Sequence, residues 1–161
     1  MHLYTTPSEI EARVLKRLGR RYANETVAAS RSALVVIDMQ NYYVAEGFPS
    51  AVASARAIVP RINEMAAAMR AVGGHVIWIQ TTATGALDHW AGHHRNMLSP
   101  ESVARRLAGL DEAGEGFGLY AGLDTHASDL RVKKIKYDAM LADSSDFATH
   151  LAPLGIDTLL I

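Results

Sequence analysis

Cysteine is absent from the 161 residues of this chain. Without thiols these residues form no disulfide, and cysteine usage gives no indication of the redox compartment. No apolar run approaches the roughly 20 residues that a membrane-spanning helix needs. The first residues also lack the apolar core of a secretory signal. We therefore expect a cytoplasmic protein with no membrane partner.

An excess of one charge is missing as well. The chain carries a net charge of -1 at pH 7, so its composition provides no basic face for nucleic acid, and we expect no nucleic-acid partner. Hydrophobic residues make up 49% of the chain. A chain of this length and composition is long enough to form one domain with its own core.

Two apolar segments separated by an amphipathic segment predict an α/β fold. Residues 33–37 and 75–80 show no polar alternation, which is typical of strands buried on both faces of a parallel sheet. Between them, residues 54–72 have apolar side chains at helical spacing. These are Ile58, Ile62, Met65, Met69 and Val72. The strand–helix–strand order predicts a three-layer α/β/α domain with a mainly parallel, Rossmann-like sheet.

The remaining segments complete this expected architecture. Residues 130–135 and 157–161 are typical of further strands, and residues 145–154 of a helix. Residues 42–50 are expected to form a loop because Gly47 and Pro49 interrupt them. The sequence predicts a long irregular connection over 81–128 with one short helix at 100–108. A connection of that length inside an α/β domain is usually functional.

The first segment predicts a helical arm over residues 6–21. Thr6 is a suitable N-cap, Pro7 suits the first helical position, and Glu9 completes the spacing of a capping box. A thin apolar stripe runs among five basic side chains, so we expect a solvated face or a contact with another subunit.

Two charged residues lie where the predicted strands end. Asp38 follows the strand at 33–37, and Lys134 lies at the end of the strand at 130–135. In a parallel sheet both positions face one crevice, where a lysine can keep a carboxylate charged while that carboxylate moves a proton. Simpler interpretations remain open: Asp38 as a cap of the next element, and Lys134 as a charge that protects an edge strand.

Three ordered segments resemble the isochorismatase-like hydrolase superfamily. Residues 33–41, Ala-Leu-Val-Val-Ile-Asp-Met-Gln-Asn, resemble its apolar strand followed by Asp-x-Gln-Asn. Residues 132–140 are similar to its motif Lys-x-x-Tyr-(Ser/Asp)-Ala-Phe, with Met140 in place of the phenylalanine. Residues 155–161 resemble the strand that precedes its third motif.

The resemblance implies a role for each matching residue. Asp38 would be the general base and Lys134 its catalytic partner. Gln40 and Asn41 would shape the substrate pocket and orient the loop that carries Asp38, and Tyr137 would lie at the pocket wall. The cysteine nucleophile of the family would follow just past the last residue of this chain. We therefore expect residues 1–161 to be a single domain that lacks its C-terminal part.

The activity implied by the resemblance is hydrolysis of a C–N bond in a small amide or ureide of the N-carbamoyl type. An Asp-Lys-Cys triad would perform it without a cofactor, in a homodimer or homotetramer. Two alternatives remain. One is a vinyl-ether hydrolase of the isochorismatase type, which uses Asp38 without cysteine. The other is an inactive fragment or a degenerate family member.

A histidine-rich segment suggests a metal site at first sight. It contains His89, His93 and His94 next to Asp88, and such side chains can ligate zinc. The segment is expected to be a loop, and its spacing matches no standard helical pair of ligands. Residues 81–85 also lack the Asp-x-His metal motif of the family's nicotinamidases. We therefore expect no metal, and Trp90 either lines the substrate pocket or packs within a lid.

Overall fold

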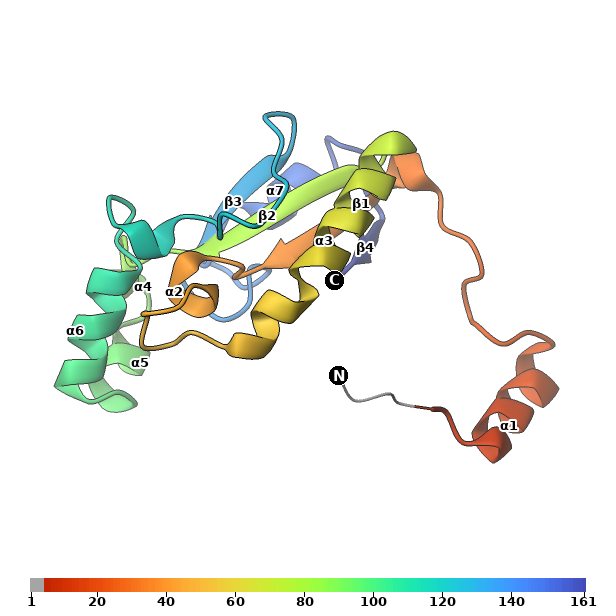
Figure 1. Cartoon of the computed structure of the whole chain (residues 1–161), viewed down its shortest axis with the longest axis horizontal. Helices are drawn as coiled ribbons and strands as arrows, with labels where there is room; N and C mark the ends of the chain where they lie inside the picture. The colour runs from red at the N-terminus through yellow and green to blue at the C-terminus, as the bar shows by residue number, and fades with distance from the viewer. Residues whose placement is uncertain (1–4) are drawn as a thin grey trace.

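A four-stranded parallel sheet forms the centre of the molecule in the computed structural model, which describes residues 5–161 (Figure 1). Its strands are β1 (Ser32–Ile37), β2 (His75–Thr81), β3 (Leu130–Lys134) and β4 (Thr158–Leu160), in the order β3-β2-β1-β4. The apolar runs predicted as buried strands are β1 and β2, the two central strands. All four expected strands are confirmed.

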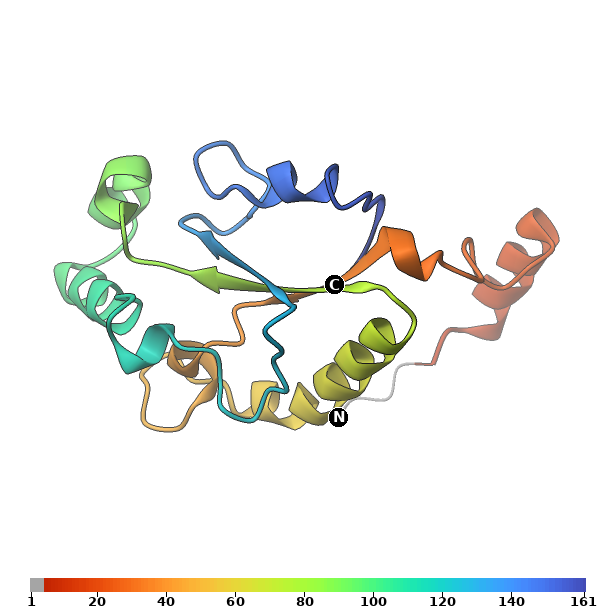
Figure 2. The same ribbon diagram turned by 90° about the horizontal axis from the view of Figure 1, so that it is seen from above.

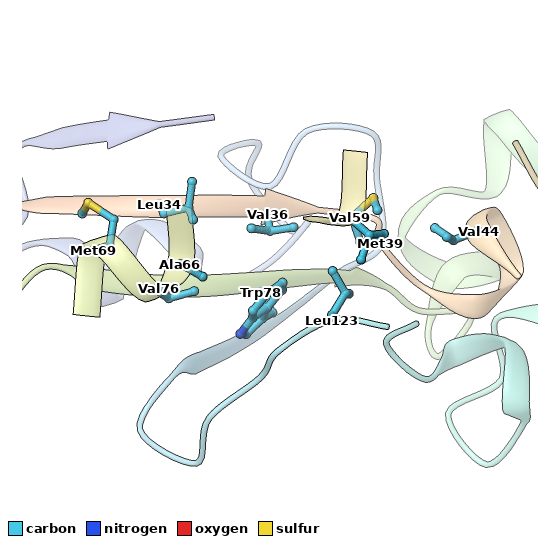
Figure 3. Packing of buried hydrophobic residues seen from close by; sticks show 10 residues of the cluster. All are labelled: Leu34, Val36, Met39, Val44, Val59, Ala66, Met69, Val76, Trp78 and Leu123. Carbon is cyan, nitrogen blue, oxygen red and sulfur yellow. The ribbon is translucent and has the colours of Figure 1, made fainter. Parts of the chain in front are cut away.

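Helices cover both faces of the sheet. Helix α3 (Ala53–Ala71) lies on one face and α7 (Phe147–Leu151) on the other (Figure 2). Because side chains alternate along a strand, β2 contributes Trp78 to the core under α3 (Figure 3) and Ile77 to the core under α7. The predicted three-layer α/β/α arrangement is confirmed.

Helix α3 buries a different stripe from the one that its sequence predicts. Met69 is buried and Ile62 packs partly on the core, but Ile58, Met65 and Val72 are exposed. The helix buries Val59 and Ala66 instead. Ile58 and Met65 line an apolar groove with β4, which is a three-residue strand at the edge of the sheet. The predicted five-residue stripe was therefore wrong: only Ile62 and Met69 of the five pack on the core, and Val72 lies at the C-cap, past the end of α3.

Short helices replace much of the expected irregular structure. The predicted loop at 42–50 begins with α2 (Asn41–Val44). The connection predicted to contain one short helix contains α4 (Ala86–His89), α5 (Ala91–Asn96), α6 (Pro100–Gly109) and the 3-10 turn η2 (Glu115–Phe117). Elements of four to six residues are too short to show a helical period, which is why the sequence did not reveal them. They gather beyond the carboxyl ends of the central strands (Figure 2).

The N-terminal arm is the helix α1 (Ser8–Leu18), which lies away from the sheet in both views (Figures 1 and 2). The predicted cap is wrong: Pro7 occupies the N-cap position in an extended conformation, and no side chain caps the helix. No residue of α1 is buried. Among residues 5–161, no helix has both the length and the apolar character needed to cross a membrane.

A buried carboxylate fixes the loop that leads into β3. Asp129 accepts hydrogen bonds from Arg70 at 2.7 Å, from the indole of Trp78 at 2.8 Å, and from the backbone N–H of His126 at 2.8 Å. Burial alone would raise the pKa of Asp129. The hydrogen bonds from Arg70, His126 and Trp78 outweigh burial and hold that pKa below its usual value.

The lowered pKa predicts how stability depends on pH. A carboxylate with a lowered pKa in the folded state stabilises the fold above its unfolded pKa of about 3.9, and this stabilisation is lost as the pH falls through the folded value. We expect Asp129→Asn to lower the free energy of unfolding at neutral pH by about 1–3 kcal/mol. Urea denaturation should also show that the variant loses less stability than wild type in the acid range. Asp124→Asn, at a half-exposed neighbour of Arg70, is the control. Parallel pH curves for wild type and Asp129→Asn would contradict this assignment.

Candidate active site

Asp38 follows β1 in an unusual backbone conformation. Its φ angle is 59°, in the left-handed region, and the only other described non-glycine residue with positive φ is Asp143. Its backbone N–H still donates to the carbonyl of Ile79 at 2.9 Å, so the residue remains tied to β2. Aspartate tolerates this region better than most residues, but such conformations often occur at functional positions.

Lys134 approaches Asp38 from β3. Side chains alternate along this edge strand, so Lys133 points outward to Glu112 while Lys134 points inward. Only 2% of Lys134 is exposed, so it is not a surface charge that protects the edge. Its Nζ donates to Oδ2 of Asp38 at 3.0 Å. The structure therefore brings together the two strand-end residues selected from the sequence.

Thr81 completes this cluster and was missed in the sequence. It pairs with Lys134 in the register of β2 and β3 and is almost fully buried. Its Oγ1 donates to Oδ1 of Asp38 at 2.7 Å and accepts from Nζ of Lys134 at 2.8 Å. Both carboxylate oxygens of Asp38 are thus fixed by neighbours. A polar residue at the end of an apolar strand could have indicated Thr81 as a site residue. The predicted strand ended at Gln80, so Thr81 was assigned to the connection that follows.

Gln40 and Asn41 hold the loop that carries Asp38. The Gln40 side chain is fully buried, donates to the carbonyls of Thr81 and Phe117, and accepts from the Thr81 N–H at 2.6 Å. Asn41 donates to the carbonyl of Glu115 at 2.9 Å. Both side-chain amides therefore bind backbone groups that connect the Asp38 loop to β2 and η2.

The electrostatic environment of Asp38 is asymmetric. Its side chain is 32% exposed, whereas that of Lys134 is 3% exposed, so the carboxylate is the more accessible of the two charged groups. Tyr43 lies close by. Burial is the main cause that raises the pKa of Tyr43, the Arg106 charge opposes it and the Asp38 charge adds to it. The Tyr43 hydroxyl therefore stays protonated at neutral pH.

Tyr137 and Trp90 belong to an aromatic cluster beside the charged residues. Tyr137 is 69% exposed and borders two cavities, one of about 270 Å³ that Lys134 lines and one of about 230 Å³ that Arg106 lines. Trp90 lines neither of these cavities. Its ring stacks on His93 at 3.9 Å and contacts Tyr137 edge-on at 4.7 Å between centroids. Trp90 therefore supports the residues that form the cavity wall.

The histidine cluster lies in helices rather than in the predicted loop. His89 is exposed at the end of α4, whereas His93 and His94 are buried in α5. Burial lowers the pKa of His93, and the neighbouring charges of His94 and Arg106 lower it further, so His93 is neutral at pH 7. Within residues 5–161, no group of three or more His, Cys, Asp or Glu side chains is placed to hold a metal ion.

Sequence comparison relates most of this chain to one family. Residues 32–161 match the family model described as the isochorismatase domain. The ureidoacrylate amidohydrolase RutB of Klebsiella variicola (strain At-22) is 40% identical over 152 residues, covering 83% of this chain and 64% of the relative. The chain therefore spans slightly less than two thirds of the length of that curated relative.

Solved structures with the same fold include two related proteins. A cysteine hydrolase from Pseudomonas syringae pv. phaseolicola 1448A superposes with a TM-score of 0.72 at 22% identity, covering 84% of this chain and 60% of the other. An isochorismatase family protein from Desulfovibrio vulgaris subsp. vulgaris str. Hildenborough gives a TM-score of 0.64 at 26% identity, covering 81% and 65%. At 22% identity, the similarity to the Pseudomonas syringae protein shows a shared fold alone.

Proposed function

Because the chain belongs to the isochorismatase family, we propose that it provides Asp38 and Lys134 to an amidohydrolase site that cleaves a C–N bond in a small amide or ureide. The observation that carries this proposal is the ion pair between Asp38 and Lys134, bridged by Thr81 at the carboxyl ends of three neighbouring strands. The amidohydrolase name of the curated relative supports the choice of bond.

In this proposal Asp38 is the general base of covalent catalysis. Its carboxylate takes the proton of a cysteine thiol, and the thiolate forms a C–S bond to the carbonyl carbon of the substrate. The C–N bond then breaks as the protonated Asp38 returns the proton to the leaving nitrogen. Water hydrolyses the thioester and restores the thiol. Since residues 1–161 contain no cysteine, the thiol of this triad comes from outside these residues.

Lys134 supports the Asp38 carboxylate from within the protein interior, where only 3% of its side chain is exposed. Its ammonium group has three oxygen partners, on Asp38, Thr81 and the backbone of Lys136. A cation held this firmly needs no reorganisation when the proton moves, which is the advantage of a pre-organised site. The Thr81 hydroxyl holds the two charged groups in place, because it donates to Asp38 and accepts from Lys134.

The other residues selected from the sequence are assigned to holding the site in place or forming its wall, and none of them takes part in proton transfer. Gln40 and Asn41 have their amides engaged by backbone groups, so we assign them to holding the Asp38 loop rather than to contact with substrate. Tyr137 is assigned to the substrate wall because it is exposed and borders both cavities. Trp90 supports that wall through His93. No step of the proposed reaction requires a cofactor.

The mass and the thiol content of the protein purified from its source test this proposal. The 161 residues account for 17.4 kDa. We expect a larger intact mass, at least one alkylation by iodoacetamide, and ammonia release from 3-ureidopropionate that alkylation abolishes. A mass of 17.4 kDa without alkylation would contradict the cysteine mechanism. Hydrolysis of a vinyl ether by Asp38 alone would then be the activity to measure.

A further inference from the structure

Helix α1 lacks a surface on which to pack. None of its residues is buried, and residues 19–28 connect it to the rest of the chain without helix or strand. The helix has 11 residues, and no side chain caps its N-terminus. Isolated helices of this length are marginal in water, because most helical stability in proteins comes from the packing of an apolar face. A partner for this face would supply that packing.

The face that α1 presents combines apolar side chains with positive charge. Its apolar residues recur every fourth position and therefore share one face of the helix. These are Ile10, Val14 and Leu18. Arg13 and Arg17 line a cavity of about 310 Å³ together with part of this stripe. Within residues 5–161, neither arginine forms a salt bridge. A complementary surface would be apolar with negative charge at its edge.

The loop between β3 and α7 exposes such apolar side chains. We call residues 136–143 the β3–α7 loop. A hydrogen bond of 2.9 Å from the backbone N–H of Ile135 to the carbonyl of Ser144 closes its base. Met140 and Leu141 are 52% and 51% exposed, so two large apolar side chains stand next to each other in water.

The same loop carries negative charge. Asp138 and Asp143 are exposed, and neither forms a salt bridge in the described part of the chain. The basic residue of the loop, Lys136, donates to the carbonyl of Ala142 at 2.8 Å. The φ angle of Asp143 is 59°, a conformation that costs energy and often occurs at functional positions. The β3–α7 loop therefore complements α1 in both apolar character and charge.

The two surfaces lie at opposite ends of the sheet. Helix α1 lies beyond the end at which β1 begins, whereas the β3–α7 loop follows the end at which the parallel strand β3 finishes (Figure 2). A second copy of the chain can bring its own loop to α1. In a two-fold pair this contact forms twice, since each copy provides one helix and one loop.

The apolar groove between α3 and β4 is a poorer match for α1. No acidic residue lines it. Its one charged lining residue, Arg61, pairs with Glu64 at 2.6 Å and has the same sign as the arginines of α1. Charge therefore favours the β3–α7 loop over this groove.

We propose that α1 of one copy docks on the β3–α7 loop of a second copy of this chain. The apolar stripe of α1 packs on Met140 and Leu141 and gives the helix the surface that its own chain does not provide. The two unpaired arginines of α1 face the two loop aspartates. Apolar burial stabilises the contact, and the charges select the partner surface.

Reversal of charge on each surface tests this proposal. One variant carries Arg13→Glu with Arg17→Glu. The other carries Asp138→Lys with Asp143→Asn, because asparagine tolerates the left-handed backbone. Sedimentation velocity over a dilution series measures the concentration at which copies associate, and circular dichroism verifies the fold. We expect each variant alone to associate only at concentrations about tenfold or more above those of wild type, because attraction between the surfaces is lost.

An equimolar mixture of the two variants distinguishes a contact between copies from one within a chain. In the mixture each reversed helix meets a reversed loop, and each native helix meets a native loop. Association should therefore return to within about threefold of wild type. No recovery on mixing, association of either variant at wild-type concentrations, or a wild type that stays monomeric would overturn the proposal.

Ile58→Asp is the matched control. Ile58 is 51% exposed and lines the groove between α3 and β4, so this substitution places a charge on the competing surface. The variant should associate as wild type does. Loss of association in Ile58→Asp with unchanged association of the two charge variants would assign the interface to the groove and contradict docking on the β3–α7 loop.

Discussion

Asp38→Asn is expected to lower the rate of ammonia release by about a hundredfold or more, since general base catalysis typically contributes that much. The amide cannot take the thiol proton, although it occupies nearly the same volume as the carboxylate. Asparagine also tolerates the left-handed conformation at φ 59°, so the backbone turn after β1 should persist. The measurement is kcat and KM for 3-ureidopropionate, with circular dichroism to verify the fold.

Asp143→Asn is the control for this substitution. Asp143 has the same φ of 59° and is exposed, so the control makes the same chemical change in the same backbone conformation. Its activity should equal that of wild type. If Asp38→Asn kept more than about a tenth of the wild-type rate, Asp38 would not be the base of the reaction.

Asp38→Asn should also lower the free energy of unfolding. It leaves the Lys134 ammonium group, 3% exposed, without its counter-charge, although the oxygens of Thr81 and Lys136 remain as partners. Removal of one partner from a buried ion pair costs about 3–5 kcal/mol, and the partial exposure of Asp38 places the expected loss at the lower end. Urea denaturation measures this loss.

The sequence predicted the charged pair because the underlying rule is geometric. Parallel strands bring their carboxyl ends to one edge, so Asp38 after β1 and Lys134 at the end of β3 were expected to meet. Period-two alternation also places Lys134 opposite to Lys133. The strand that ends at Asp38 was clear from its apolar run, whereas β3 contains three charged residues, and the choice of Lys134 over Lys133 rested on the resemblance to the family motif.

Thr81 and Arg106 could not be found by the same reasoning. Thr81 bridges the pair only because the β2–β3 register places it opposite Lys134, and register is not visible in one strand. The position of Arg106 depends on the path of a long connection. That path is fixed by distant backbone contacts, such as the pairing of Gln40 with Leu119. Such contacts form between segments whose separate sequences carry no shared pattern.

Lys134→Met is expected to lower kcat by about a hundredfold with little change in KM, because Lys134 is 2% exposed and the hydrogen bonds of its ammonium group go to Asp38, Thr81 and the backbone of Lys136 rather than outward. Lys133→Met is the control: it neutralises the neighbouring lysine, which is exposed and pairs with Glu112. That variant should retain wild-type kinetics. An equal loss in the two variants would indicate a general effect on β3 and would contradict the assigned role.

Substitutions of Lys134 and of Asp38 should lower the free energy of unfolding by different amounts. Methionine fills most of the volume of Lys134, and the Asp38 carboxylate left behind is one third exposed and regains water. Lys134→Met should therefore cost less free energy of unfolding than Asp38→Asn, which leaves a buried cation. The double variant should be more stable than Asp38→Asn alone, because it removes that unpaired cation. Simple additivity of the two losses in urea denaturation would show that Asp38 and Lys134 do not form a coupled pair.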